Sequence, residues 1–79
     1  MRALVTGASG FIGSHIVKRL VAAGDSVRAF VRPTSDVSFL RALGVELAQG
    51  DITDPASLPP AMDGIEAVYH AAAASLERW

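Results

Sequence analysis

This sequence of 79 residues predicts an α/β fold in which helices cover a parallel four-stranded sheet. Short apolar segments alternate along the chain with amphipathic ones in the order β-α-β-α-β-α-β, and a glycine-rich turn at residues 6–13 joins the first two. Such alternation gives parallel strands joined by right-handed crossovers. We therefore expect one domain over residues 1–79 with strand order 3-2-1-4, which is half of a doubly wound, Rossmann-like three-layer fold.

The first part of the chain predicts two strands and the helix between them. Residues 2–6 are short and apolar, as buried parallel strands are. The helix that begins near Phe11 is expected to end at Gly24, which has the place of a C-terminal cap. Residues 26–31 form the second strand. The apolar residues of the helix recur at the spacing of a core-facing surface, and they are Ile12, Ile16, Val17, Leu20 and Val21.

The middle of the chain predicts a loop, a helix and a strand in that order. Residues 32–36 contain proline, serine and aspartate, which favour a loop. Residues 38–43 form a short helix closed by Gly44, and residues 45–49 form the third strand.

The third helix is the element with the most conflicting signals. Asp54 and Pro55 are typical of an N-cap and a first helical residue. The pair at residues 59–60, both proline, should stop or distort this helix within about two turns, because an interior proline costs about 3 kcal/mol. Residues 65–70 form the fourth strand, and no structure is predicted for residues 71–79.

Composition and charge exclude several classes of function. The net charge is −1 and the basic residues form no cluster, so we expect no nucleic-acid partner. There is no cysteine, and the two histidines lie far apart, so we expect no metal site. The apolar runs are far shorter than the roughly 20 residues that span a bilayer, and the N-terminus has no signal-peptide pattern. We therefore expect a cytoplasmic protein without membrane contact.

The glycine-rich turn predicts a site for the pyrophosphate of a dinucleotide. Gly7 permits a tight turn, Gly10 lets the backbone approach the phosphates, and Gly13 lets the helix pack close to the sheet. Backbone N–H groups near Phe11 and Ile12 would point at the phosphates, where the helix dipole favours negative charge. The alternative is a turn that needs glycine for packing only.

The chain resembles a known enzyme family over its whole length. Residues 6–15 resemble the opening of the extended branch of the short-chain dehydrogenase/reductase superfamily, specifically the NAD-dependent epimerase/dehydratases and the dihydroflavonol-reductase-like group. Three further segments resemble the same family in the same order, at residues 31–35, 50–54 and 68–72. The resemblance implies the N-terminal, NAD(P)-binding portion of such an enzyme.

The residues after the second strand favour NADP(H) over NAD(H). NAD-preferring folds carry an acid roughly 20 residues beyond the glycines, where it bonds the ribose 2′-hydroxyl. This chain has Val31 at that position, followed by Arg32. A guanidinium can bind a 2′-phosphate in a forked geometry, and Thr34 and Ser35 could add hydroxyl donors. The alternatives are a solvated Arg32 and NAD as the cofactor.

The resemblance also implies contacts to the adenosine half. It implies that the Asp51 carboxylate bonds the adenine amino group and that Ile52 packs beside the ring. The alternative for Asp51 is a bond to the backbone of its own turn. At the end of the fourth strand, small residues would let the backbone pass close to the ribose. The candidate cofactor-binding residues are thus Gly7, Ser9, Gly10, Phe11, Ile12, Gly13, Arg32, Thr34, Asp51, Ile52, His70, Ala71 and Ala72.

No candidate catalytic residue is found in the sequence. Enzymes of this family transfer hydride with a Tyr-x-x-x-Lys pair, in which the tyrosine moves the proton. Tyr69 is followed four residues later by Ala73, and Lys18 is the only lysine. We therefore expect the chain alone to be inactive. Three interpretations stay open: the N-terminal part of a longer enzyme, a stand-alone module that binds NADP(H) without turnover, or a self-associating structural protein that lost the cofactor.

The fourth strand is expected to lie at an edge of the sheet. An unpaired apolar edge invites pairing with another chain. We therefore expect a homodimer of two-fold symmetry, formed through this edge or through residues 71–79.

Overall fold

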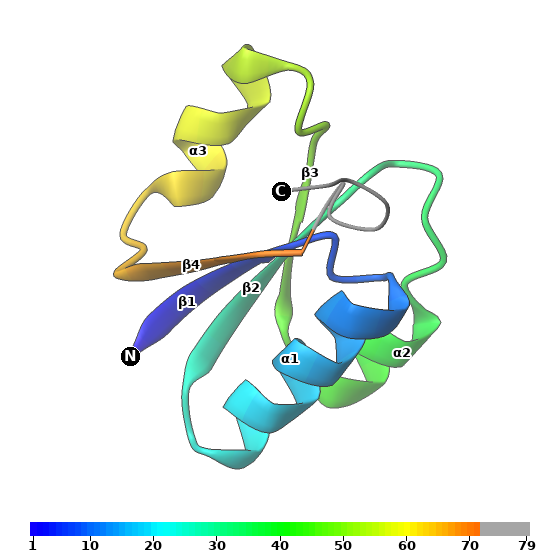
Figure 1. Cartoon of the computed structure of the whole chain (residues 1–79), viewed down its shortest axis with the longest axis vertical. Helices are drawn as coiled ribbons and strands as arrows, with labels where there is room; N and C mark the ends of the chain where they lie inside the picture. Colours follow the sequence, from blue (N-terminus) through cyan, green and yellow to red (C-terminus); the bar gives the residue numbers. More distant parts are fainter. Residues whose placement is uncertain (72–79) are drawn as a thin grey trace, which may run out of the picture.

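The computed structural model describes residues 1–71, which form a sheet with helices on both faces (Figure 1). The four strands are parallel, in the order β3-β2-β1-β4, so the predicted fold class and strand order are confirmed. The elements in chain order are β1 (Arg2–Thr6), α1 (Phe11–Ala22), β2 (Ser26–Val31), α2 (Ser38–Leu43), β3 (Glu46–Gln49), the 3-10 helix η1 (Pro55–Ser57), α3 (Leu58–Met62) and β4 (Ala67–His70).

Each face of the sheet carries its own apolar cluster. Helices α1 and α2 cover one face and α3 covers the other (Figure 1). Successive side chains of a strand point to opposite faces. In the central strand β1, Val5 accordingly packs under α1 and α2, whereas Leu4 packs under α3 with Phe30 and Ala61. Both β1 side chains are fully buried, which explains why this strand is apolar almost throughout.

Helix α1 ends as the sequence predicts. The N–H of Gly24 donates to the carbonyl of Val21 at 3.0 Å, and the N–H of Asp25 donates to that of Leu20, also at 3.0 Å. These two bonds form a Schellman motif, which satisfies carbonyl groups that the last turn leaves free. The chain then turns directly into β2.

The two prolines divide the third helical segment, as expected. The Asp54 carboxylate accepts a bond from the Ala56 N–H at 3.2 Å and caps η1, which begins at Pro55. Pro59 and Pro60 then occupy the first turn of α3. Proline has no N–H to donate, and the first turn of a helix is where that loss costs least. The chain therefore starts a second short helix instead of continuing the first.

One predicted core position in α1 is wrong. Ile12 is 59% exposed, although its spacing placed it on the apolar face. The residues of α1 that are buried against the sheet and loop are Gly13 and Val17. Because an α-helix turns about 100° per residue, Ile12 lies to the side of the line that joins them.

Two predicted strand boundaries are also early. β3 begins one residue after Val45, at Glu46, and β4 begins two residues after Ile65, at Ala67. The N–H of Ile65 closes the preceding turn by donating to the Met62 carbonyl at 3.0 Å, so it is not available to the sheet.

Candidate cofactor-binding site

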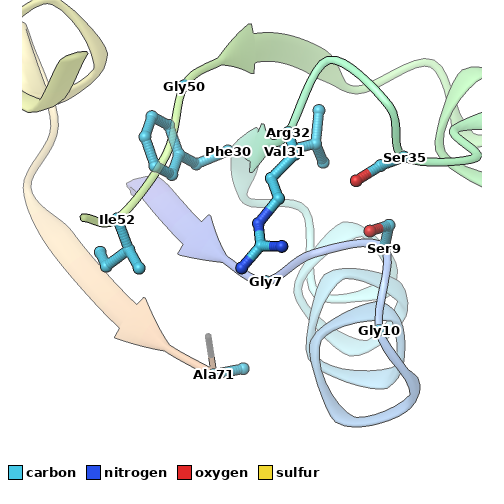
Figure 2. A pocket seen from close by; sticks show the side chains of 10 residues that line it. All are labelled: Gly7, Ser9, Gly10, Phe30, Val31, Arg32, Ser35, Gly50, Ile52 and Ala71. Carbon is cyan, nitrogen blue, oxygen red and sulfur yellow. The ribbon is translucent and has the colours of Figure 1, made fainter. Parts of the chain in front are cut away.

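A cavity of about 300 Å³ opens at the carboxyl ends of the four strands (Figure 2). Segments that follow β1, β2, β3 and β4 all contribute to its walls. In open parallel sheets this edge, where the strand order reverses, is the place where ligands bind. The lining residues are Gly7, Ser9, Gly10, Phe30, Val31, Arg32, Ser35, Gly50, Ile52 and Ala71.

The wall next to α1 is the glycine loop. Gly7 has a φ of 63°, and its carbonyl accepts a bond from the Gly10 N–H at 3.0 Å, which closes a tight turn. Gly10 is also the N-cap of α1, and no acidic side chain lies in the first helical turn. The first N–H groups of a helix have no partner within it and favour an anion. This wall therefore suits a phosphate group.

Gly13, a buried residue of α1, packs against the glycine loop that forms this wall. It is buried and does not line the cavity. The absence of a side chain at Gly13 lets α1 approach the peptide of Gly7.

Arg32 is the charged residue of the cavity. It follows β2 directly, and its side chain extends over the cavity that Gly7 also lines (Figure 2). Ser9 and Ser35 supply hydroxyl groups to the lining, and no acidic residue among residues 1–71 lines it. A positive group and several donors thus face a space that no acidic side chain of residues 1–71 lines, which suits an anionic ligand.

The opposite wall of the cavity is apolar and is formed by Phe30 and Ile52. Asp51 directly precedes Ile52 in the chain. Phe30 is 3% exposed. The Asp51 carboxylate accepts bonds from the N–H and the hydroxyl of Thr53, at 2.9 and 2.7 Å. These two bonds, with a smaller contribution from the positive charge of Arg32, hold the pKa of Asp51 below its ordinary value. Asp51 itself does not line the cavity, and it closes its own turn here.

The end of β4 is tied to the end of β1. The hydroxyl of Thr6, a residue that is 2% exposed, lies 2.8 Å from Nδ1 of His70. The N–H of Ala71 donates to the Thr6 carbonyl at 3.2 Å, which brings Ala71 to the cavity. Ala72 lies outside the described residues.

The structure brings only part of the predicted set to the cavity. Phe11 and Ile12 instead line a second, mostly apolar hollow of about 400 Å³ between α1 and Tyr69. Thr34 is exposed in the loop after β2, and Ser35 reaches the cavity in its place. The predicted residues that do line it are Gly7, Ser9, Gly10, Arg32, Ile52 and Ala71.

Sequence reasoning did not propose Phe30 or Gly50 as site residues. Both sit at the carboxyl end of a strand, Phe30 in β2 and Gly50 directly after β3. That position was the available signal, because the ends of all parallel strands meet at one edge. An apolar strand residue is otherwise indistinguishable in sequence from an ordinary core residue.

Other kinds of site are absent from the described part of the chain. Residues 1–71 contain no group of three metal-ligating side chains. Within the same range no helix has the length and apolar character to cross a membrane.

Comparisons with known proteins agree with this geometry. The chain is 49% identical over 73 residues to the sterol demethylase protein B of Methylococcus capsulatus, covering 92% of this chain and 22% of that protein. It superposes on the crystal structure of gox2253 with a TM-score of 0.85 and 45% identity, covering 98% of this chain and 23% of the other. For the UDP-glucose-4-epimerase of Stenotrophomonas maltophila with bound NAD, the TM-score is 0.82 and the identity is 33%. This match covers 99% of this chain and 25% of the epimerase chain.

The chain therefore spans about a quarter or less of the length of these relatives. Residues 3–79 match the family described as NAD dependent epimerase/dehydratase, which confirms the resemblance seen in the sequence. With a family match over nearly its whole length, a parallel sheet in the order β3-β2-β1-β4 and a glycine loop at the cavity, this chain belongs to the NAD dependent epimerase/dehydratase family.

Proposed function

We propose that this chain binds NADP(H) in the cavity at the carboxyl ends of its strands. In this proposal it is the N-terminal, cofactor-binding part of an NAD(P)-dependent epimerase, dehydratase or reductase. The observation that carries the proposal is the position of Arg32, whose guanidinium lies over a cavity walled by the glycine loop and lined by no acidic residue in the described range. The cytoplasmic location expected from the sequence belongs to the same proposal.

The preference for NADP(H) rests on charge. The 2′-phosphate distinguishes NADP(H) from NAD(H), and a guanidinium binds a phosphate through two parallel hydrogen bonds. Arg32 and Ser35 supply the donors on the side of the cavity that follows β2. An acid at this end of β2 would repel the phosphate, but the residue there is Val31.

The proposed role of these residues is binding, not proton transfer. The cofactor supplies the hydride chemistry when bound, and this chain would hold the pyrophosphate at the N-terminus of α1. No Tyr-x-x-x-Lys pair occurs in the 79 residues. Under this proposal the proton donor for the reaction comes from another part of a longer polypeptide or from another chain.

A comparison of two arginine variants tests the proposal. Arg32→Ala removes the guanidinium at the cavity, and Arg41→Ala removes an exposed guanidinium from α2 as a matched control. Bonds to charged groups are worth about 1.5–3 kcal/mol, so Arg32→Ala should bind NADPH about tenfold more weakly or worse. Arg32→Ala should change the affinity for NADH little, and Arg41→Ala should change the affinity for either dinucleotide little. An equal loss for both dinucleotides would contradict a contact with the 2′-phosphate.

We also propose that the chain forms a homodimer through the edge of β4 or through residues 71–79. Within residues 1–71, β4 pairs with β1 alone, so its other edge has no strand beside it. Val68 in this strand is 44% exposed. Exposed strand edges of this kind pair readily with another chain. Of residues 71–79, only Ala71 lies among the described residues.

A further inference from the structure

Ser57 lies at the end of η1 and does not line the cavity. Its hydroxyl contacts Asp51, which lies in the chain between the cavity-lining residues Gly50 and Ile52. The N–H of Asp51 donates to the Ser57 hydroxyl oxygen at 3.2 Å. The same oxygen lies 3.0 Å from the Asp51 carbonyl and 2.8 Å from the Asp54 carbonyl. A hydroxyl has one proton to donate, so it serves one of these two carbonyls at a time. In either case it accepts from Asp51 and joins the two ends of the turn.

Close packing at the same point leaves this turn little freedom. A Cβ built on Gly50 would lie 2.5 Å from the Phe30 ring and 2.8 Å from the Ser57 Cβ. Gly50 and Phe30 line the cavity, and Phe30 is almost fully buried. Ser57 therefore packs against Gly50, a residue of the cavity wall, without lining the cavity itself.

Gly50, just before the turn, is held to β2 by its N–H, which donates to the Val31 carbonyl at 2.9 Å, whereas the other bonds within residues 51–56 are local. Asp51 bonds Thr53, and Asp54 bonds Ala56, each two residues away. Ser57 is different because its hydroxyl bonds Asp51, six residues earlier, and because η1 continues directly from Ser57 into α3.

Helix α3 is in turn anchored to the sheet by Arg28 of β2. Its Nη1 donates to the carbonyl oxygens of Ala61 and Asp63, at 2.7 and 2.8 Å. Ser57 thus connects the turn to a helix whose position the sheet determines.

We infer that Ser57 is a positioning residue for the dinucleotide, acting through Gly50 and Ile52. The inference rests on the proposed function, because it assigns the wall formed by Gly50, Phe30 and Ile52 to the bound cofactor. Ser57 does not touch the ligand space. Its hydroxyl fixes where the backbone of Asp51 lies, and hence where Ile52 enters the cavity, while the N–H of Gly50 is held by the Val31 carbonyl.

Three variants test this inference with NADPH as the probe in calorimetric titration. Ser57→Ala removes the acceptor for the Asp51 N–H, so NADPH should bind about tenfold more weakly. Ser57→Thr keeps the hydroxyl and should restore most of the affinity. Ser38→Ala is the matched control, because its hydroxyl bonds Asp36 at 2.7 Å and it does not line the cavity. Unchanged NADPH affinity in Ser57→Ala would overturn the inference.

Amide hydrogen exchange gives a second readout that needs no ligand. The Asp51 N–H should be protected in the wild-type protein, although Asp51 lies outside every helix and strand. In Ser57→Ala its protection should fall by more than that of Leu4 in β1, which reports global unfolding. If the wild-type Asp51 N–H exchanges like that of an unstructured peptide, the inference is wrong. If the wild-type protein binds neither NADPH nor NADH, the proposed function fails, and the exchange result still decides whether Ser57 holds the turn.

Discussion

Gly13 of α1 packs directly against the peptide of Gly7 in the loop that precedes the helix. A Cβ at position 13 would lie 2.7 Å from the Gly7 carbonyl carbon and 2.9 Å from the Ala8 Cα. Gly10 is different, because a Cβ there would lie 3.4 Å from the Gly7 carbonyl oxygen. The two glycines therefore have separate roles. Gly13 sets the position of α1 under the loop, and Gly10 keeps the cavity side of the loop open.

Alanine substitutions should separate these roles. Gly13→Ala forces the helix and loop apart, and overpacking of this kind costs about 1–3 kcal/mol of the free energy of unfolding. Gly10→Ala should cost less stability but should weaken NADPH binding, because its methyl group would face the phosphates. Thermal unfolding and calorimetric titration of both variants check this. Equal loss of stability in the two variants would contradict the assignment.

The contact between Thr6 and His70 should be measurable as a coupling free energy. The Thr6 hydroxyl lies 2.8 Å from the His70 ring nitrogen and joins the ends of β1 and β4. A double-mutant cycle with Thr6→Val and His70→Ala should give a coupling of about 0.5–1.5 kcal/mol in chemical denaturation. A coupling of zero would show that the bond contributes nothing to the folded state.

The architecture could be predicted from the sequence because its signals are local. Gly24 closes the end of α1 through its N–H, and Asp54 caps the start of η1 through its carboxylate. The apolar run of β1 reflects burial on both faces of the sheet. The alternation of strands and helices then leaves one simple topology.

The site could be predicted only in part, because the features that the sequence did not predict depend on packing between distant segments. The spacing of Ile12 fits the apolar face, but its exposure follows from the close approach of Gly13 to the loop. The position of Phe30 in the cavity depends on Gly50, which follows a different strand. The turn around Asp51 depends on Ser57, whose hydroxyl has no sequence signature. Such contacts are between residues that local patterns do not relate.

Asp51 should titrate below its ordinary value of 3.8. The N–H and hydroxyl of Thr53 stabilise the ionised carboxylate, so the folded state lowers the pKa of Asp51. Its contribution to stability is therefore complete above the pKa of the unfolded chain and is lost as pH falls through the folded pKa. Carbon NMR of the Asp51 carboxyl group measures the midpoint directly.

A variant of Thr53 tests the cause of this shift. Thr53→Val should raise the pKa of Asp51 without restoring it fully, because the backbone N–H still donates. Asp36 is the internal control, since its pKa is lowered by the N–H and hydroxyl of Ser38 in another loop. A midpoint for Asp51 that is unchanged in Thr53→Val would show that the hydroxyl bond does not form in solution.

Association of the chain should depend on the edge of β4. Val68→Lys places a charge on this strand, a change that prevents edge pairing. We expect the wild-type protein to be a dimer at micromolar concentration in light scattering and Val68→Lys to be a monomer. Phe39→Lys is the matched control, because Phe39 is 46% exposed on α2, in an element other than the edge strand. A monomeric wild-type protein, or loss of the dimer in both variants, would argue against the β4 edge.

The most direct test of the central claim is a calorimetric titration of the wild-type protein with NADPH and with NADH. The account predicts that NADPH binds in the micromolar range with one site per chain, and that NADH binds about tenfold more weakly because it lacks the 2′-phosphate that Arg32 would bind. Binding of neither dinucleotide would contradict the account, and the glycine loop would then serve the architecture of the fold alone.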